Sequence, residues 1–233
     1  MSISKILPLF TLAVVVPVYA ATIIANNAGA LPGTAEDLTG LSPTEIVGTL
    51  PDTTDALLGV NMFKIDIANS EEFSAITIGS AFGIPDTELF LFDSSGLGVY
   101  MNDDIDGGNT LSCLPSVIAN PCSSSRPVNI GPLGAGVYYL AITRSSNLPL
   151  SVSGDIFTIF NFTDVVGPDL TMGGNDPVTN WDGGAFTTPD TDLVNYDIVL
   201  TGTTPEPATW IMTGAACALL GILRSIKASQ SRE

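Results

Sequence analysis

The sequence predicts an all-β fold, an antiparallel β-sandwich of jelly-roll-like type, with an N-terminal signal peptide and one C-terminal transmembrane helix. Between residues 21 and 202 no long apolar pattern has the 3.6-residue period of a helix. Short apolar or alternating runs recur there instead, and Gly, Pro, Asn and Asp bound them. Nine such runs are the expected strands: 45–50, 61–67, 72–78, 88–93, 98–102, 127–130, 136–144, 155–162 and 194–201.

Two of these runs carry the alternation of strands most clearly. In 63–67 the apolar side chains face one way, while Lys64 and Asp66 face the other. In 89–92 leucines alternate with phenylalanines, so the two residue types lie on opposite faces. Residues 163–192 form a long Gly-, Pro-, Asp- and Thr-rich stretch without a strand pattern, and loops of that length tend to be functional or mobile.

The first twenty residues have the organisation of a secretory signal peptide. Lys5 supplies the positive n-region, and an apolar core follows from residue 6 to 18. The sequence Val18-Tyr19-Ala20 has small residues at the positions that a signal peptidase recognises, so we expect cleavage after Ala20. Residues 21–44 are then a polar lead-in to the domain, with an early edge strand.

The C-terminal end combines a rigid acidic tripeptide, an apolar run and a basic tip. Pro205-Glu206-Pro207 precedes the sixteen-residue apolar run 208–223, and Arg224, Lys227 and Arg232 follow. The apolar run is marginally short for a bilayer crossing, which takes about 17–25 residues. The basic residues place the C-terminus on the cytoplasmic side. An ordinary tail anchor behind a proline-rich linker is the alternative interpretation.

This order of parts resembles the PEP-CTERM sorting tail of bacterial surface and secreted proteins. The resemblance implies a temporary membrane anchor that an exosortase-like enzyme cuts near the tripeptide, with Pro205, Glu206 and Pro207 as the recognition element. The expected organisation is signal peptide 1–20, lead-in 21–44, β-sandwich domain 45–202, linker with the sorting motif 203–207, transmembrane helix 208–223 and basic tip 224–233.

The composition of the part between the two ends excludes several functions. Residues 21–205 contain 3 basic and 22 acidic residues, so their formal net charge is −19. Such a surface repels nucleic acid and suits cation binding or solubility outside the cell. The absence of histidine removes Ser-His and Cys-His nucleophile pairs and most zinc sites. We therefore expect no enzyme, although a hydrolase built on carboxylates alone stays open.

The three cysteines indicate one disulfide. Cys217 lies in the apolar C-terminal run, whereas Cys113 and Cys122 would face an oxidising exterior nine positions apart. A disulfide between these two is expected because secreted proteins rarely keep two free thiols so close together.

The body of the chain resembles the bacterial pre-peptidase C-terminal domain. The resemblance covers roughly residues 45–202 and implies a β-sandwich accessory module, with calcium binding in some relatives. No catalytic domain accompanies it in this sequence, so a protease activity does not follow. The segments that carry the resemblance are Gly48-Thr49-Leu50 with Asp55, Phe63-Lys64-Ile65, residues 86–93 with Gly96, Asn102-Asp103-Asp104, residues 134–142 and residues 195–201.

An acidic loop is the best candidate for a metal site. Asn102, Asp104 and Asp106, followed by Gly107, place oxygen ligands at alternate positions before a turn, and calcium takes six to eight such ligands. The twelfth position of the loop is Cys113 rather than glutamate, so the loop is not an EF-hand. Asp86 and Asp93, at the two ends of the preceding strand, could reach the same ion. A solvated Asx-rich turn without a metal is the alternative.

The aromatic residues give less indication of a ligand. Phe90, Phe92, Tyr138 and Tyr139 are expected as core and edge side chains rather than as a sugar-binding platform. Trp181 could stack on a sugar ring or pack onto the rim of the sandwich, and the second is favoured. The expected function is a non-enzymatic structural or interaction module of the bacterial cell surface or extracellular matrix. A calcium-dependent module that binds carbohydrate, for instance exopolysaccharide, is the alternative.

Overall fold

A computed structural model describes residues 21–25, 28–50, 59–79, 86–118, 122, 130–183 and 194–203. The expected signal peptide, the sorting motif, the apolar run 208–223 and the basic tip lie outside these residues. Within the described ranges, no helix is both long enough and apolar enough to cross a membrane.

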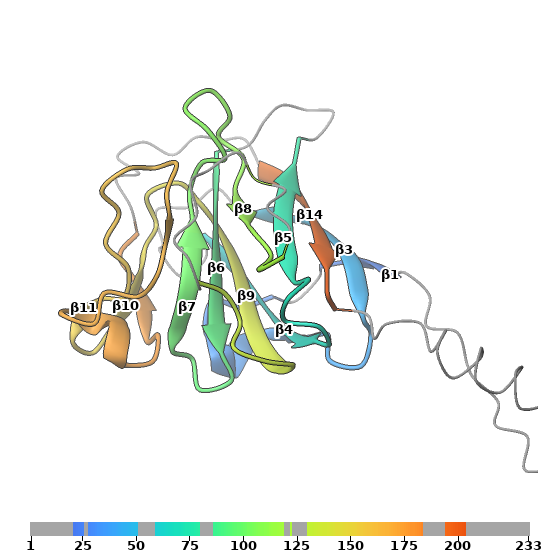
Figure 1. Cartoon of the computed structure of the whole chain (residues 1–233), viewed down its shortest axis with the longest axis horizontal. Coiled ribbons are helices and arrows are strands. Elements are labelled where there is room, and N and C mark those ends of the chain that lie inside the picture. The colour runs from blue at the N-terminus through green and yellow to red at the C-terminus, as the bar shows by residue number, and fades with distance from the viewer. Residues whose placement is uncertain are drawn as a thin grey trace, which may run out of the picture. The chain divides into compact units, whose positions relative to one another are not determined.

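The body is a two-layered β structure, as the sequence predicts (Figure 1). Each of these two main layers is one sheet, and a smaller layer covers the other face of the first sheet. In spatial order, the first sheet contains six strands: β12 (Val165–Val166), β7 (Gly98–Asn102), β6 (Thr87–Asp93), β9 (Gly136–Arg144), β4 (Val60–Ile67) and β2 (Glu36–Asp37). The second contains five: β1 (Ala21–Ile24), β3 (Pro43–Leu50), β14 (Val194–Thr201), β5 (Ser74–Ile78) and β8 (Cys113–Leu114).

The pairing in both sheets is antiparallel except at one edge of each. The edge strands β1 and β2 run parallel to their neighbours β3 and β4. The centre of the first sheet is built from long antiparallel ladders, and β9 pairs along most of its length with β4 and β6. The predicted antiparallel sandwich is therefore correct for the centre, and the lead-in does supply an edge strand.

The main core lies between the two sheets. Alternate residues of the first sheet, such as Phe63, Leu91 and Leu140, pack there against Ile46 and Ile198 of the second sheet. The expected alternation in 63–67 is confirmed, since Phe63, Ile65 and Ile67 are buried in this core.

A second core covers the opposite face of the first sheet. Phe90 and Phe92 point to this side and contact Phe157 and Trp181. These two contact residues belong to a layer that holds the small sheet β11 (Gly154–Asp155), β10 (Pro149–Ser151) and β13 (Asn180–Trp181) and the short 3₁₀ turns η1 (Pro32–Thr34) and η2 (Gly173–Asn175). In Figure 1 the first sheet stands between this layer and the second sheet. Both faces of β6 are therefore buried.

One predicted strand is wrong, and one cannot be compared. Residues 155–162 are not a strand beyond Asp155 of β11, because Ile156 and Phe157 are both buried in the second core and so break the alternation. Of the predicted run 127–130, only Ile130 is described, and it lies outside any strand. The long stretch 163–192 contains β12, η2 and β13 among its described residues.

The first and last described residues of the body meet at one point. Ala21 of β1 pairs with Pro43, the first residue of β3. The hydroxyl of Thr203, just beyond β14, donates a hydrogen bond to the carbonyl oxygen of the same Pro43 and is buried.

Candidate metal centre

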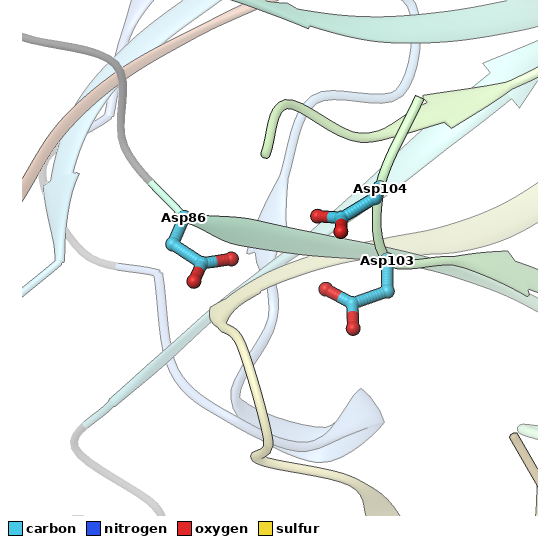
Figure 2. Close-up of side chains that lie close together, drawn as sticks. All are labelled: Asp86, Asp103 and Asp104. Atoms are coloured by element: carbon cyan, nitrogen blue, oxygen red, sulfur yellow. The ribbon is translucent and has the colours of Figure 1, made fainter. Parts of the chain in front are cut away.

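Three aspartates converge at one end of the β6–β7 pair (Figure 2). Asp86 immediately precedes β6, and Asp103 and Asp104 immediately follow β7. Since β6 and β7 are antiparallel, with Leu89 opposite Asn102, the start of one strand and the end of the other lie together. One carboxylate oxygen from each aspartate lies within 4.8 Å of the other two.

Asp103 is the most deeply buried member of this trio. Its side chain is only 2% exposed, and its Oδ1 atom is buried without a hydrogen-bond partner among the described residues. Burial, together with the nearby charges of Asp104 and Asp86, raises the pKa of Asp103 to about 7. Burial also raises the pKa of Asp86 and that of Asp104. A bound cation would remove this mutual repulsion and complete the coordination of the unpaired oxygen.

The β9–β10 connection supports the trio from the other side. The Ser145 side chain hydrogen-bonds to the carboxylates of Asp86 and Asp103. Ser146 has a left-handed backbone with φ of 70°, which is uncommon for a residue with a side chain and recurs at functional sites. Its backbone donates to Glu88, a carboxylate that is 1% exposed and electrostatically coupled to Asp103. Burial raises the pKa of Glu88 well above its ordinary value.

The loop that follows β7 is shaped by side chains that bind the backbone. Asn102 Oδ1 accepts the N–H of Cys113 at 2.7 Å, and its Nδ2 donates to the carbonyl oxygens of Asp104 and Asp164. Cys113 also forms a disulfide with Cys122, with 5.8 Å between the two Cα atoms, as the sequence predicts. The acidic segment is therefore held by β7, by the disulfide segment and by the 161–164 turn.

The structure brings two of the five predicted ligands together. Asp86 and Asp104 belong to the trio, whereas the side chains of the other three bind backbone groups. Asp93 Oδ1 accepts the N–H groups of two residues in the β6–β7 turn, and Asp106 Oδ1 accepts that of Gly108. The amide of Asn102 is engaged as described above. Asn102 and Asp106 shape the segment that follows β7, whereas Asp93 lies at the opposite end of β6, so none of the three belongs to the trio.

Sequence reasoning missed Asp103. In a continuing strand the side chain of Asp103 would point away from those of its two neighbours, so the alternate positions are the expected ligands. However, β7 ends at Asn102, and beyond it the backbone no longer alternates. The one sequence signal that could have identified Asp103 is the uninterrupted pair of aspartates at the end of a strand.

The trio fits a hard divalent cation better than any other ligand class. Carboxylate oxygens are the preferred ligands of calcium, and its coordination shell is completed readily by backbone carbonyls and water. Three carboxylates in one place also exceed the charge of one such ion, which suits tight electrostatic binding. The residues present therefore fit a calcium site on this part of the chain.

Exposed aromatic side chains lie beside the trio. The N–H of Asp104 donates to the carbonyl oxygen of Phe162 at 2.9 Å. Phe160 is 92% exposed and Phe162 is 61% exposed, so both rings face solvent next to the acidic segment. Trp181 does not, since it is 2% exposed and its indole N–H donates to the carbonyl oxygen of Ala30 at 2.8 Å. The favoured prediction, that Trp181 packs against the sandwich, is confirmed.

The other aromatic predictions agree with the structure. Phe90 and Phe92 are fully buried, and Tyr138 is 8% exposed, so none of them forms a sugar-binding platform. Comparison with known proteins adds no family assignment: no family model matches the chain, and no curated protein shows significant similarity to it.

Proposed function

We propose that this chain is an exported, non-enzymatic structural or interaction module of a bacterial cell surface or extracellular matrix. In this proposal the signal peptide is removed after Ala20, and an exosortase-like enzyme recognises Pro205, Glu206 and Pro207 and removes the C-terminal tail. The body is a jelly-roll-like sandwich of the pre-peptidase C-terminal type, and it holds one calcium ion at Asp86, Asp103 and Asp104.

The observation that carries the calcium proposal is the buried, unpaired Oδ1 of Asp103 beside two further carboxylates. A buried polar atom without a partner is destabilising by about 1–3 kcal/mol, so folded proteins rarely retain one unless water, an ion or a functional role accounts for it. Export is supported by the Cys113–Cys122 disulfide, which forms and persists in oxidising compartments.

Intact mass spectrometry of the mature protein from its native host tests the export part. We expect a chain that starts at Ala21, ends near the Pro205–Pro207 tripeptide and has lost two hydrogens to the disulfide. A full-length protein at the cell surface, with Arg232 still attached, would contradict removal of the tail.

Calcium binding is tested by isothermal titration calorimetry and by thermal unfolding with and without calcium. Binding should raise the melting temperature, and the double variant Asp103→Asn and Asp104→Asn should lose that response. Glu71→Gln and Glu72→Gln, which neutralise two exposed carboxylates on the 69–73 turn, are the matched control and should keep it. An equal calcium response in both double variants would place the ion elsewhere.

A second candidate function is calcium-dependent binding of carbohydrate such as exopolysaccharide. The observation that favours it is the pair of exposed rings, Phe160 and Phe162, on a turn that is hydrogen-bonded to Asp104. Aromatic faces stack on the apolar faces of sugar rings, and a metal that orders the acidic segment would also order this turn.

A glycan panel probed with and without a chelator separates the two candidates. Saturable binding that is lost on chelation, in Asp104→Ala and in Phe162→Ala supports the carbohydrate-binding module. No binding across a broad panel, with calcium still bound, leaves the structural module.

A further inference from the structure

A pocket of about 430 Å³ opens beside the metal centre, on the side of the 145–148 connection. Its volume lies within the range of small-molecule sites. Two of its lining residues interact with the trio. The carboxylate of Glu88 is repelled by that of Asp103, and the carbonyl oxygen of Phe162 accepts a hydrogen bond from the N–H of Asp104. The residues around it are Glu88, Ser146, Leu148, Asp155, Phe157, Thr158, Ile159, Phe162 and Asp182.

The ionisable side chains among these described lining residues are all acids, with no lysine or arginine to neutralise them. Asp182 is held in place because its Oδ1 accepts the backbone N–H of Leu148 at 2.9 Å. Asp155 is the last residue of β11 and is half-buried, and within the described part of the chain its carboxylate has no hydrogen-bond or ion-pair partner. Glu88 forms the buried floor and is fixed by the Thr143 hydroxyl at 3.2 Å.

The rest of the wall is apolar or aromatic. Phe157 is 1% exposed and is anchored in the second core through its ring contacts with Phe90 and Phe92, so it forms the rigid base of this wall. Leu148 and Ile159 are partly buried around the same core, and Phe162 contributes an exposed ring. The pocket therefore offers negative charge and an apolar wall in one place.

We propose that this pocket binds an organic ammonium group carried on a body with an apolar face, as in an amino sugar with a free amine. A carboxylate forms its strongest hydrogen bonds with a charged donor, and an ammonium also interacts favourably with the face of a phenylalanine ring. The apolar face of the ligand packs on Phe162 and on the partly buried Leu148 and Ile159. The negative charge of the whole body attracts cations and strengthens the encounter.

This inference names the ligand class of the carbohydrate-binding candidate. It rests on that candidate only in proposing that a sugar carries the ammonium group. Two sources can supply the same chemistry: an amino sugar, or a simple amine such as phenethylamine. A neutral sugar has the hydroxyl groups but lacks the charge, and so it should bind more weakly.

The test uses the full chain in detergent and four probes that form two pairs, each with a charged and a neutral member. The first pair is a glucosamine disaccharide and its N-acetylated counterpart, and the second is phenethylamine and phenethyl alcohol. Affinities are measured by calorimetry at a pH where the amines are protonated, both in calcium and in chelator. We expect each amine to bind at least tenfold more tightly than its neutral partner. A tighter glucosamine disaccharide identifies the sugar as the source, and a tighter phenethylamine identifies the simple amine.

Variants localise the binding. Asp155→Asn and Asp182→Asn keep the shape of the wall, and Asp182→Asn keeps an oxygen to accept the Leu148 N–H. Together they should reduce amine affinity at least fivefold and leave the weak affinity for the neutral probes unchanged. Glu71→Gln with Glu72→Gln removes two charges away from the pocket and controls for non-specific attraction to an acidic protein.

Each outcome has a separate meaning. Equal affinity for the charged and neutral members of both pairs overturns the inference, as does an equal loss in the pocket and control variants. Neutral glycan binding without an amine preference overturns it while the carbohydrate-binding candidate survives. Amine binding that persists in chelator, with no glycan binding, supports it and removes the calcium-dependent candidate.

Discussion

The side-chain oxygen of Asn102 accepts the backbone N–H of Cys113 at 2.7 Å in the interior of the protein. This bond joins the end of β7 to the start of β8, and so it connects the acidic segment to the disulfide. The side-chain amide nitrogen of Asn102 donates to the carbonyl oxygens of Asp104 and Asp164, so one side chain connects three segments of backbone.

Replacing Asn102 by alanine should therefore both destabilise the protein and loosen the aspartate trio. The variant leaves buried backbone groups without partners, and we expect the free energy of unfolding to fall by about 2–3 kcal/mol. Urea unfolding measures this change, and calorimetry should show weaker calcium binding. Asn161→Ala, an exposed position whose amide binds the neighbouring Thr163 and Asp164, is the control and should change stability by about 0.5 kcal/mol or less.

The disulfide should stabilise the same region. A loop of this length contributes on the order of 2–3 kcal/mol in the chain-entropy model, so the double variant Cys113→Ser and Cys122→Ser should lose about that much. Because Asn102 binds the backbone of Cys113, the losses from Asn102→Ala and from removal of the disulfide should not be additive. A double-mutant cycle measures the coupling energy between the Asn102 hydrogen bond and the disulfide. Additivity of the two losses within about 0.5 kcal/mol would show that they act independently.

Stability of the metal-free protein should decrease as the pH rises from about 4 to 7. The pKa of Asp103 is raised to about 7 in the folded state, from about 3.9 in an unfolded chain. Between these values the folded state binds more protons than the unfolded state, so deprotonation on raising the pH favours unfolding. Glu88, whose pKa is raised as well, acts in the same direction. Melting temperatures over this range, measured in chelator, test the expected sign.

Asp103→Asn separates the contribution of this carboxyl from that of Glu88. The variant should flatten the pH dependence in part and stabilise the metal-free protein above pH 7 by about 1–3 kcal/mol, because an uncharged amide replaces an unpaired buried charge. It should also lose the stabilisation by calcium. A variant less stable than the parent at pH 8 in chelator would indicate that Asp103 Oδ1 has a partner even without metal.

Trp181 should contribute strongly to stability although it lies in a stretch without a strand pattern. Its ring meets Phe90 and Phe92 edge-on, with centroids 5.3 and 6.3 Å away. Trp181→Ala should therefore cost about 3–5 kcal/mol. Trp181→Phe, which mainly loses the hydrogen bond to Ala30, should cost about 1–2 kcal/mol.

Chemical unfolding measures both Trp181 variants, and Phe160→Ala is the control at an exposed ring. In a Trp210→Phe background Trp181 is the sole tryptophan, so its fluorescence reports the second core directly. Emission at long wavelength in the folded protein would contradict its burial.

The central strands could be predicted because their patterns are local. In β4 apolar residues alternate with Lys64 and Asp66, and β6 is a short apolar run between polar residues. Paired strands bury such patterns wherever they lie in the fold. The second core could not be predicted in the same way, because Ile156 and Phe157 are buried by a tertiary contact with β6. An apolar run of that kind has the same appearance as a strand when only the sequence is considered.

The candidate site could be predicted in part for a related reason. Asp86 and Asp104 flank strands that the sequence places close together, so their meeting follows from the pairing of β6 with β7. The roles of Asn102 and Asp103 depend on the residue at which β7 ends. The strand boundary thus decides which side chain enters the site, and boundaries are the weakest part of any pattern argument.

The contact of Thr203 with Pro43 has a mechanical consequence. A tether attached to the chain beyond Thr203 would pull first on β14, which lies between β3 and β5 and is hydrogen-bonded to both. A force along this strand acts in shear on the hydrogen bonds of both ladders together. An edge strand, in contrast, can be pulled away one hydrogen bond at a time. Tension applied to the chain beyond Thr203 is therefore resisted by both ladders of β14 at once.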